Sequence, residues 1–389
     1  MNRWSAAPLR DDDTRLAASS ANEIVIGWTP DGRHVLFTSD RTGSTSLWAQ
    51  RIIGGKPSSE PVLIKEDIRP SAMGMTRSGA LYYSVTLSQQ DVYIASYDFA
   101  AGTAIARPSR VAQRYVGFNS SPAWSRDGTH LAYLSQRGPS TYLIVRSIDT
   151  GMEREFKPDF GDYVVGPVWS PAGAVTVAGR DRDGRWGIYN LDSQSGASRR
   201  LFANESGTPS PLAWSPDART LYLERWPENN GLRVIVARDL QSGHEREIVR
   251  ATPDAVAVSP DSRFLALTDR TSNDASLLIV PLEGGTPRNL LRVHNPETLG
   301  FVTWSADGAF LIFAKVVQQG GNARREFMRV PAAGGEAVRI ELGPDFTDIQ
   351  GVSLRIHPDG RRFAFNTLRQ PRSEIWALEN FLPVSAAAR

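Results

Sequence analysis

The chain has 389 residues, of which 41% are hydrophobic and 22% are charged, and this composition excludes disorder along its whole length. Lysine and arginine (44 residues) nearly balance aspartate and glutamate (42 residues), so a nucleic-acid partner is not implied. The absence of cysteine excludes disulfide frameworks, thiolate nucleophiles and cysteine-ligated zinc or iron–sulfur sites.

Residues 1–12 are predicted to be a flexible lead-in to the fold. The opening MNRWSAAPLRDDDTR has no apolar stretch, and three aspartates stand where a signal peptide would be hydrophobic. No apolar run reaches the roughly 18 residues that a membrane helix needs. We therefore expect a soluble chain without membrane insertion, cytoplasmic if the sequence is complete, with an extracytoplasmic location open if it is a fragment of a longer protein.

One sequence unit recurs eight times, at intervals of 44 to 52 residues. Each unit has an aromatic or aliphatic residue, a short turn rich in Ser, Pro, Asp and Gly, and then a β-rich run. The residues that precede the turns are Trp28, Met75, Trp124, Trp169, Trp214, Val258, Trp304 and Ile356. A period in the mid-forties with four short strands per unit is typical of a β-propeller blade.

Within a unit, strand A ends at the Trp and a tight turn leads to strand B. Predicted B strands are HVLFTS (34–39), HLAYLS (130–135), TLYLERW (220–226), FLALTD (264–269) and FLIFAK (310–315). Predicted C strands are SLWAQRI (46–52), TYLIVRSI (141–148), RVIVARDL (233–240), SLLIVPL (276–282) and EFMRVP (326–331). A second turn with glycine then leads to the outer strand D, so each unit forms an antiparallel sheet.

The last unit lacks an outer strand, because EIWAL (374–378) runs into the end of the chain. The segment 13–28 resembles 197–214, which carries a D strand and the next A strand. We therefore predict that residues 14–18 complete the final blade and that residues 13–383 form a single eight-bladed propeller, followed by a tail at 384–389. A disordered N-terminal tail is the alternative for residues 14–18, and seven blades remain open if the weak second unit is not a blade.

The W-S-P-D-G turns, the SDRTGS and SQRGPS loops, the GG-x-P turns and the closing SEIWALENFLP resemble the TolB-type, WD-like β-propeller repeats of bacteria. They are similar in particular to the propellers appended to bacterial serine/threonine kinases and winged-helix regulators. The resemblance covers residues 13–383 and implies the fold, whereas propellers host unrelated functions. No kinase motif and no G-x-S-x-G nucleophile elbow occur in the sequence.

Few residues indicate catalytic or metal chemistry. The histidines form no H-E-x-x-H and no pair at i, i+4. His34 and His130 begin B strands, and His357 lies in a turn, so we expect solvated or half-buried residues at blade ends; His244 and His294 lie on loops of different blades, where a ligand could reach them. The aspartates of the S-P-D-G turns are expected to cap those turns, and Asp181 to Gly184 is expected to be a hairpin turn rather than a calcium loop.

Arginine recurs at or just after the end of strand B in seven of the eight units, on the face that carries the B–C and D–A loops. Such a ring of guanidinium groups would suit carboxylate, phosphate or an acidic peptide. The candidate ligand-binding residues are Arg41, Arg137, Arg180, Arg182, Arg225, Arg270, Arg324 and Arg369. The competing interpretation is ion pairing between neighbouring blades with acids of the D–A loops, namely Asp67, Asp159, Asp162, Glu205, Asp254, Glu297, Asp345 and Asp348.

The sequence thus predicts a non-enzymatic, monomeric binding propeller, a sensor or scaffold module of a bacterial signalling or envelope-associated system. A rigid ring with variable loops suits recognition of a protein, a peptide or a small anionic ligand. We expect no cofactor and no bound metal. The alternatives are a metal-assisted lyase or hydrolase acting at the propeller channel, and the propeller part of a larger peptidase-like protein.

Overall fold

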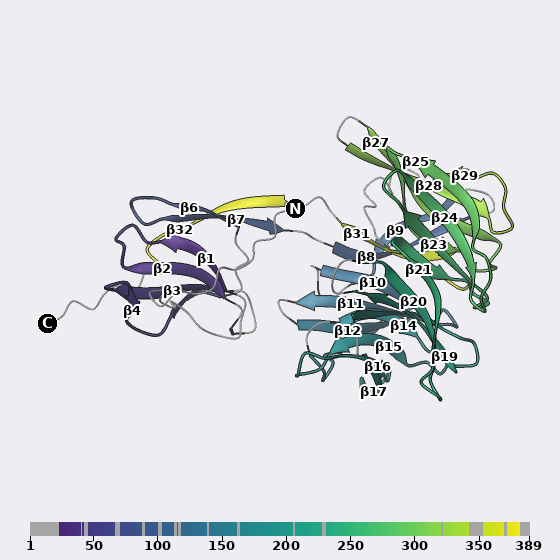
Figure 1. Cartoon of the computed structure of the whole chain (residues 1–389), viewed down its shortest axis with the longest axis horizontal. Helices are drawn as coiled ribbons and strands as arrows, with labels where there is room; N and C mark the ends of the chain where they lie inside the picture. The colour runs from purple at the N-terminus through teal and green to yellow at the C-terminus, as the bar shows by residue number, and fades with distance from the viewer. Residues whose placement is uncertain are drawn as a thin grey trace. The chain divides into compact units, whose positions relative to one another are not determined.

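The structure is a computed structural model of the whole chain (Figure 1). It describes residues 23–381 except 40, 43–45, 67–70, 88–89, 100–102, 113–114, 116–117, 138–139, 162–163, 205–206, 228–230, 320–321, 342–352 and 369–371. Every regular element in these residues is a β-strand, which confirms the predicted all-β class. Within the described part, no helix is long and apolar enough to cross a membrane.

The chain divides into two compact units, residues 1–87 with 371–389 and residues 88–370, each of which is described by itself. The smaller unit contains two antiparallel sheets, β1-β2-β3-β5 with β4 attached to β3, and β6-β7-β32. Their strands are β1 (Glu23–Trp28), β2 (His34–Ser39), β3 (Ser46–Ile53), β4 (Lys56–Pro57), β5 (Val62–Lys65), β6 (Ser71–Met75), β7 (Leu81–Leu87) and β32 (Arg372–Leu378). Leu36, Leu47 and Ala49 of the first sheet pack on Leu81 and Tyr83 of the second.

The larger unit contains five consecutive sets of four antiparallel strands, one blade per sequence repeat. Their strands are β10 (Phe118–Trp124), β11 (His130–Arg137), β12 (Ser140–Ser147), β13 (Glu153–Phe156), β14 (Val164–Trp169), β15 (Val175–Arg180), β16 (Trp186–Leu191), β17 (Ser198–Ala203), β18 (Thr208–Trp214), β19 (Thr220–Trp226), β20 (Arg233–Asp239), β21 (Glu245–Ala251), β22 (Pro253–Val258), β23 (Phe264–Arg270), β24 (Asp274–Pro281), β25 (Arg288–His294), β26 (Glu297–Trp304), β27 (Phe310–Gln319), β28 (Asn322–Pro331) and β29 (Val338–Ile340).

A sixth blade of the larger unit joins strands that are far apart in the sequence. In it, β30 (Leu354–Ile356) and β31 (Arg362–Leu368) are followed by β8 (Gln90–Asp98) and β9 (Thr103–Arg110). The central pairing is antiparallel and runs from Arg362 opposite Ser96 to Leu368 opposite Gln90. This blade therefore combines strands A and B of the eighth repeat with strands C and D of the second. One parallel pair, Phe118 with Gln90, also joins it to the β10 blade.

These six blades close into a ring. The inner strands β10, β14, β18, β22, β26 and β30 contact one another in that order, and β30 contacts β10 in turn. Tryptophan indoles reinforce the neighbour contacts: Trp169 Nε1 donates to Ala123 O (2.9 Å), and Trp304 Nε1 donates to Ala257 O (3.1 Å). Trp124 Nε1 donates to Arg355 O (3.0 Å) at the contact between the last and first blades. The larger unit is thus a six-bladed ring, within the range that propellers adopt.

The strand pairing differs from the predicted single ring of eight blades. The eight repeats do produce eight sets of paired strands, yet strand C of the eighth repeat lies in β32 and pairs with β7 of the second repeat. Strand C of the second repeat lies in β8 and pairs with β31 of the eighth. An eight-bladed or seven-bladed ring is therefore not confirmed, the closing role of residues 14–18 falls outside the described residues, and one propeller over residues 13–383 stays a prediction.

The S-P-D-G segments form the tight turns that the sequence predicts. In the turn between β10 and β11, Ser125 Oγ donates to Asp127 Oδ1 (2.6 Å), and the backbone N of Thr129 donates to the same oxygen (3.0 Å). Ser125 Oγ in turn accepts from the backbone N of His130 (2.9 Å). The structural role assigned to the aspartate, that of fixing a local turn, is therefore confirmed here.

These turns should make the fold sensitive to acid. The hydrogen bonds from Ser125 and Thr129 lower the pKa of Asp127 from its ordinary value of 3.8 to about 2. Because the pKa is lower in the folded state, the stabilisation is present above about pH 4 and is lost as the pH falls towards 2. We expect the urea midpoint of unfolding to drop over this window, and the drop to shrink in Asp127→Asn. An equal drop in Asp127→Asn and in Asp183→Asn, a change in an exposed turn, would contradict this assignment.

Candidate functional site: the central cavity

The ring encloses a cavity of about 410 Å³, called here the central cavity, which is lined by the A–B turns of all six blades. Each turn follows an inner strand, so the six turns meet at one end of the ring. Trp124, Trp169, Trp214 and Trp304 contribute to the wall, together with serines and prolines of the repeated turn. The repeat thus places chemically similar residues around one cavity. The residues that depart from the repeat therefore set the charge of the wall.

The charged side chains that line the central cavity are Arg126 and Arg355. The turn aspartates are not among the lining residues of this cavity. Their carboxylates accept hydrogen bonds within the turns, as Asp217 does from Ser215 and Asp307 does from Ser305 (both 2.6 Å). The described wall is therefore positively charged.

Arg355 occupies an unusual position in the repeat. It stands directly before the turn-preceding residue, where the other units have Gly, Ala, Val or Thr. Its side chain is exposed to water, yet the surrounding blades lower the pKa of its guanidinium through desolvation. Its Nη1 donates to Leu354 O (3.2 Å), and no carboxylate of the described residues lies within ion-pair distance of its guanidinium. Arg355 is absent from the site residues predicted from the sequence, although its departure from the repeat was the available signal.

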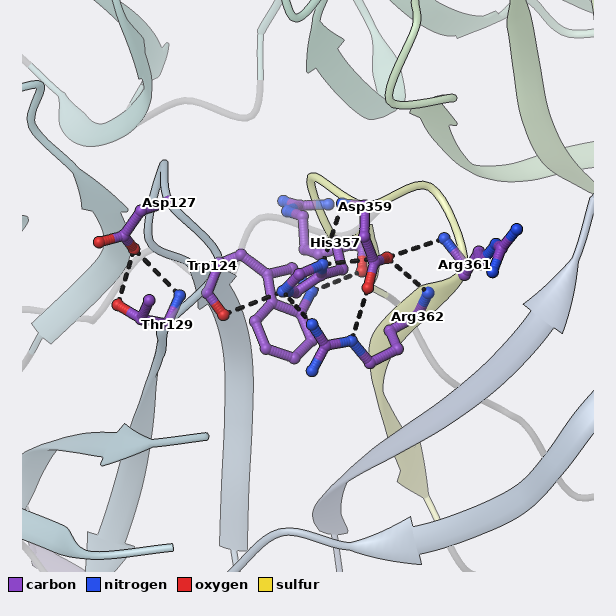
Figure 2. Close-up of polar contacts among 9 residues, drawn as sticks. Trp124, Asp127, Thr129, His357, Asp359, Arg361 and Arg362 are labelled. Atoms are coloured by element: carbon purple, nitrogen blue, oxygen red, sulfur yellow. Dashed lines mark hydrogen bonds and ion pairs between the residues drawn. The ribbon is translucent and has the colours of Figure 1, made fainter. Parts of the chain in front are cut away.

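His357 holds the junction between the β30 blade and the β10 blade (Figure 2). The backbone N of Asp359 donates to Nδ1 (3.0 Å), so Nε2 donates to Gly128 O (2.9 Å). The ring also meets Trp124 edge-on, with 4.6 Å between centroids. The expectation of a solvated or half-buried histidine is wrong, since His357 is only 3% exposed. It replaces the Ser or Thr of the other repeats, and the larger imidazole spans two blades.

Five of the predicted arginines have a carboxylate partner in the described residues, and each partner belongs to the arginine's own sheet. The pairs are Arg41 with Glu23, Arg137 with Glu155, Arg225 with Glu245, Arg270 with Asp254, and Arg324 with Glu326. In these five pairs the carboxylate comes from the arginine's own blade. Pairing between neighbouring blades stays a prediction, because five of the acids named for it, Asp67, Asp162, Glu205, Asp345 and Asp348, fall outside the described residues. An anion site on the B–C loop face stays a prediction.

Arg137 shows how such a pair is built. Its Nη2 and Nη1 atoms donate to the two carboxylate oxygens of Glu155 at 2.8 and 3.0 Å. The rings of Tyr142 and Tyr115 lie 4.7 and 4.8 Å from the guanidinium carbon. Hydrogen bonding to Glu155 raises the pKa of Arg137. Two aromatic rings and a bidentate carboxylate hold this side chain against its own blade.

The other predicted arginines have different surroundings. The guanidinium of Arg180 lies 4.9 Å from the ring centroid of Trp186. Arg182 lies in the exposed turn that follows Asp181, whose carboxylate accepts from backbone nitrogens of the same turn. That segment is therefore a hairpin turn, as expected. Arg369 falls outside the described residues.

The remaining histidines form no shared site. His34 and His130 begin β2 and β11 as predicted, and His294 Nδ1 lies 2.7 Å from Asp274 Oδ1 on an exposed edge. Among the described residues, no group of three or more His, Asp or Glu side chains is placed to hold a metal ion.

No protein-family model matches the sequence. A putative TolB from Agrobacterium tumefaciens is similar over 73% of this chain and 99% of its own, with a TM-score of 0.56 and 17% identity. TolB from Acinetobacter baumannii covers 87% of this chain and 78% of its own (TM-score 0.47, 15% identity). Oligogalacturonate lyase from Vibrio parahaemolyticus covers 82% and 94% (TM-score 0.41, 15% identity). The likeness to the first of these, together with the blades described above, shows that the chain has a TolB-like β-propeller fold.

Proposed function

We propose that this protein is a non-enzymatic recognition module that binds a peptide segment of a partner protein in the central cavity. The observation that carries the proposal is the cavity itself, formed by turns from six blades and lined by aromatic, proline and hydroxyl side chains with two arginines. Its volume of about 410 Å³ falls in the range of ligand pockets. Because four of the six turns are fixed by a bond between their own serine and aspartate, the wall is largely preorganised for binding.

The residues of the wall favour recognition over catalysis. General acid–base catalysis most often uses an imidazole or a carboxylate within reach of the substrate, and neither is among the described residues that line the cavity. Both ring nitrogens of His357 are engaged, by Gly128 O and by the backbone N of Asp359. Arginine, tryptophan and proline are residues that bind and orient ligands. The likeness of the repeats to propellers appended to bacterial kinases and regulators supports a sensor or scaffold role in a signalling or envelope-associated system.

Selection from a displayed library of random peptides tests this function. The wild-type protein should enrich a related set of peptides, and Pro216→Trp, which places a large side chain at the wall of the cavity, should lose at least about tenfold in affinity for them. Pro30→Trp is the matched control, because Pro30 occupies the same position of a turn in the smaller unit. No enrichment, or equal binding by both variants, would contradict the proposal.

A further inference from the structure

The positive charge that lines the central cavity is not neutralised by carboxylates of the same described wall. Six turns surround it, and the acidic residue of the typical turn, such as Asp217 or Asp307, bonds to the serine and backbone of that turn. Arg126 and Arg355 are the charged residues of the described lining. A ligand therefore meets positive charge and no compensating carboxylate from the described wall.

Arg355 has no carboxylate partner among the described residues, so its positive charge is open to an anionic ligand. The arginines of the B–C loop face illustrate the contrast, since Arg137 binds Glu155 through two hydrogen bonds. Arg355 instead donates to the carbonyl of Leu354 in its own strand. A guanidinium has five N–H donors, so most of its donors can still serve a ligand. The surrounding blades lower the pKa of this guanidinium through desolvation, yet the side chain stays exposed, so a ligand can reach its donors.

The position of Arg355 is fixed by the ring closure. Its backbone carbonyl accepts from Trp124 Nε1 (3.0 Å), and two residues later His357 is bonded to Gly128 O (2.9 Å). Both contacts tie β30 to the neighbouring β10 blade, which also carries Arg126. The two arginines therefore come from adjacent blades across one junction, with Arg355 on the inner strand and Arg126 in the turn.

We propose that Arg355 binds a carboxylate of an acidic peptide in the central cavity, with Arg126 supplying the second positive charge. This inference rests on the proposed recognition function and names the chemistry of its ligand. Arginine suits the task because its planar donors match the two oxygens of a carboxylate. The tryptophans of the wall supply apolar surface for the peptide on either side of the acidic residue.

The test is calorimetric titration of the full chain with a hexaglutamate peptide, with hexalysine as the comparison peptide. Wild-type protein should bind hexaglutamate and not hexalysine, and Arg355→Gln should weaken binding by about tenfold or more. Arg219→Gln removes one exposed arginine of another A–B turn, outside the cavity lining, and should change the affinity less than about twofold. Arg355→Lys should fall between the wild type and Arg355→Gln, because it keeps the charge and loses the paired donors.

Thermal unfolding without peptide gives a second readout. Because the Arg355 side chain is exposed and has no ion pair with the described residues, Arg355→Gln should unfold at about the same temperature as wild type. Lost binding at an unchanged unfolding temperature is then not the result of a folding defect. Unchanged hexaglutamate affinity in Arg355→Gln would overturn the inference. Binding of inorganic phosphate, with no binding of hexaglutamate, would also overturn it in favour of a phosphate ligand. Displayed peptides could be enriched by the wild type and bind weakly to Pro216→Trp, yet bind Arg355→Gln as well as the wild type. That result would support the recognition function and contradict the carboxylate site.

Discussion

Replacing Gly128 with alanine is expected to destabilise the protein far more than replacing Gly308, although the two glycines occupy equivalent turns. Both have positive φ, +73° at Gly128 and +70° at Gly308, so each alanine costs about 1–2 kcal/mol in backbone strain. A Cβ on Gly128 would lie 2.3 Å from His357 Nε2, whereas a Cβ on Gly308 has Pro260 Cδ as its nearest neighbour, at 3.8 Å. Overpacking adds about 1–3 kcal/mol at Gly128 alone. Urea unfolding of both variants measures the difference.

A second substitution shows whether the imidazole is the cause. His357→Ser restores the residue type of the other turns and removes the ring that the new Cβ would meet. In that background, Gly128→Ala should cost about as much as Gly308→Ala does in the wild type. Equal costs for the two glycine substitutions in wild-type protein would show that the turn of the third repeat does not touch the turn of the eighth, and the six-bladed closure would be wrong.

Local features of the fold were well predicted from the sequence. The predicted strand 130–135 lies within β11, and the predicted 141–148 matches β12 to within one residue at each end. Such features depend on residues that are neighbours in the chain, as in the turn where Ser125 and Asp127 bond to each other. The repeat therefore carried reliable information about where each strand and turn lies.

The partners of the strands at the two ends of the chain could not be predicted. The second and eighth repeats both have Thr-Leu, one further residue and Gln at the end of strand B, at Thr86 and Thr367. The strands that end there, β7 and β31, are similar in sequence pattern, so the sequence does not show which strand C each of them pairs with. Since local sequence does not distinguish the two pairings, packing of the whole unit decides between them.

The candidate site was missed for a related reason. Arginines at the ends of B strands formed a visible series, yet the structure places Glu155 and Glu245 beside two of them within the same blade. Sequence spacing does not show such diagonal contacts across a twisted sheet. Arg355 stood alone in its repeat, and only the closure of the ring brings it to the cavity that the six turns share.

Two engineered cysteine pairs should differ in disulfide formation: one should oxidise and the other should stay reduced. Ser96 in β8 lies directly opposite Arg362 in β31, and opposed residues of antiparallel strands have Cβ atoms close enough for a disulfide or nearly so. Ser84 in β7 would face Tyr93 only if β7 and β8 formed a simple hairpin around residues 88–89. In the structure the neighbours of β7 are β6 and β32, and those of β8 include β31 and β9, so the second pair should stay reduced. The chain has no native cysteine to compete.

Pairing of β8 with β31 closes the six-bladed ring, and disulfide formation in these two double variants shows whether that pairing exists. It is measured by mass spectrometry after mild oxidation of the folded protein. We predict nearly complete oxidation of Ser96→Cys/Arg362→Cys and little oxidation of Ser84→Cys/Tyr93→Cys. Oxidation of the second pair with a reduced first pair would show that the second repeat keeps its own strand C, and would contradict the ring and the cavity built on it.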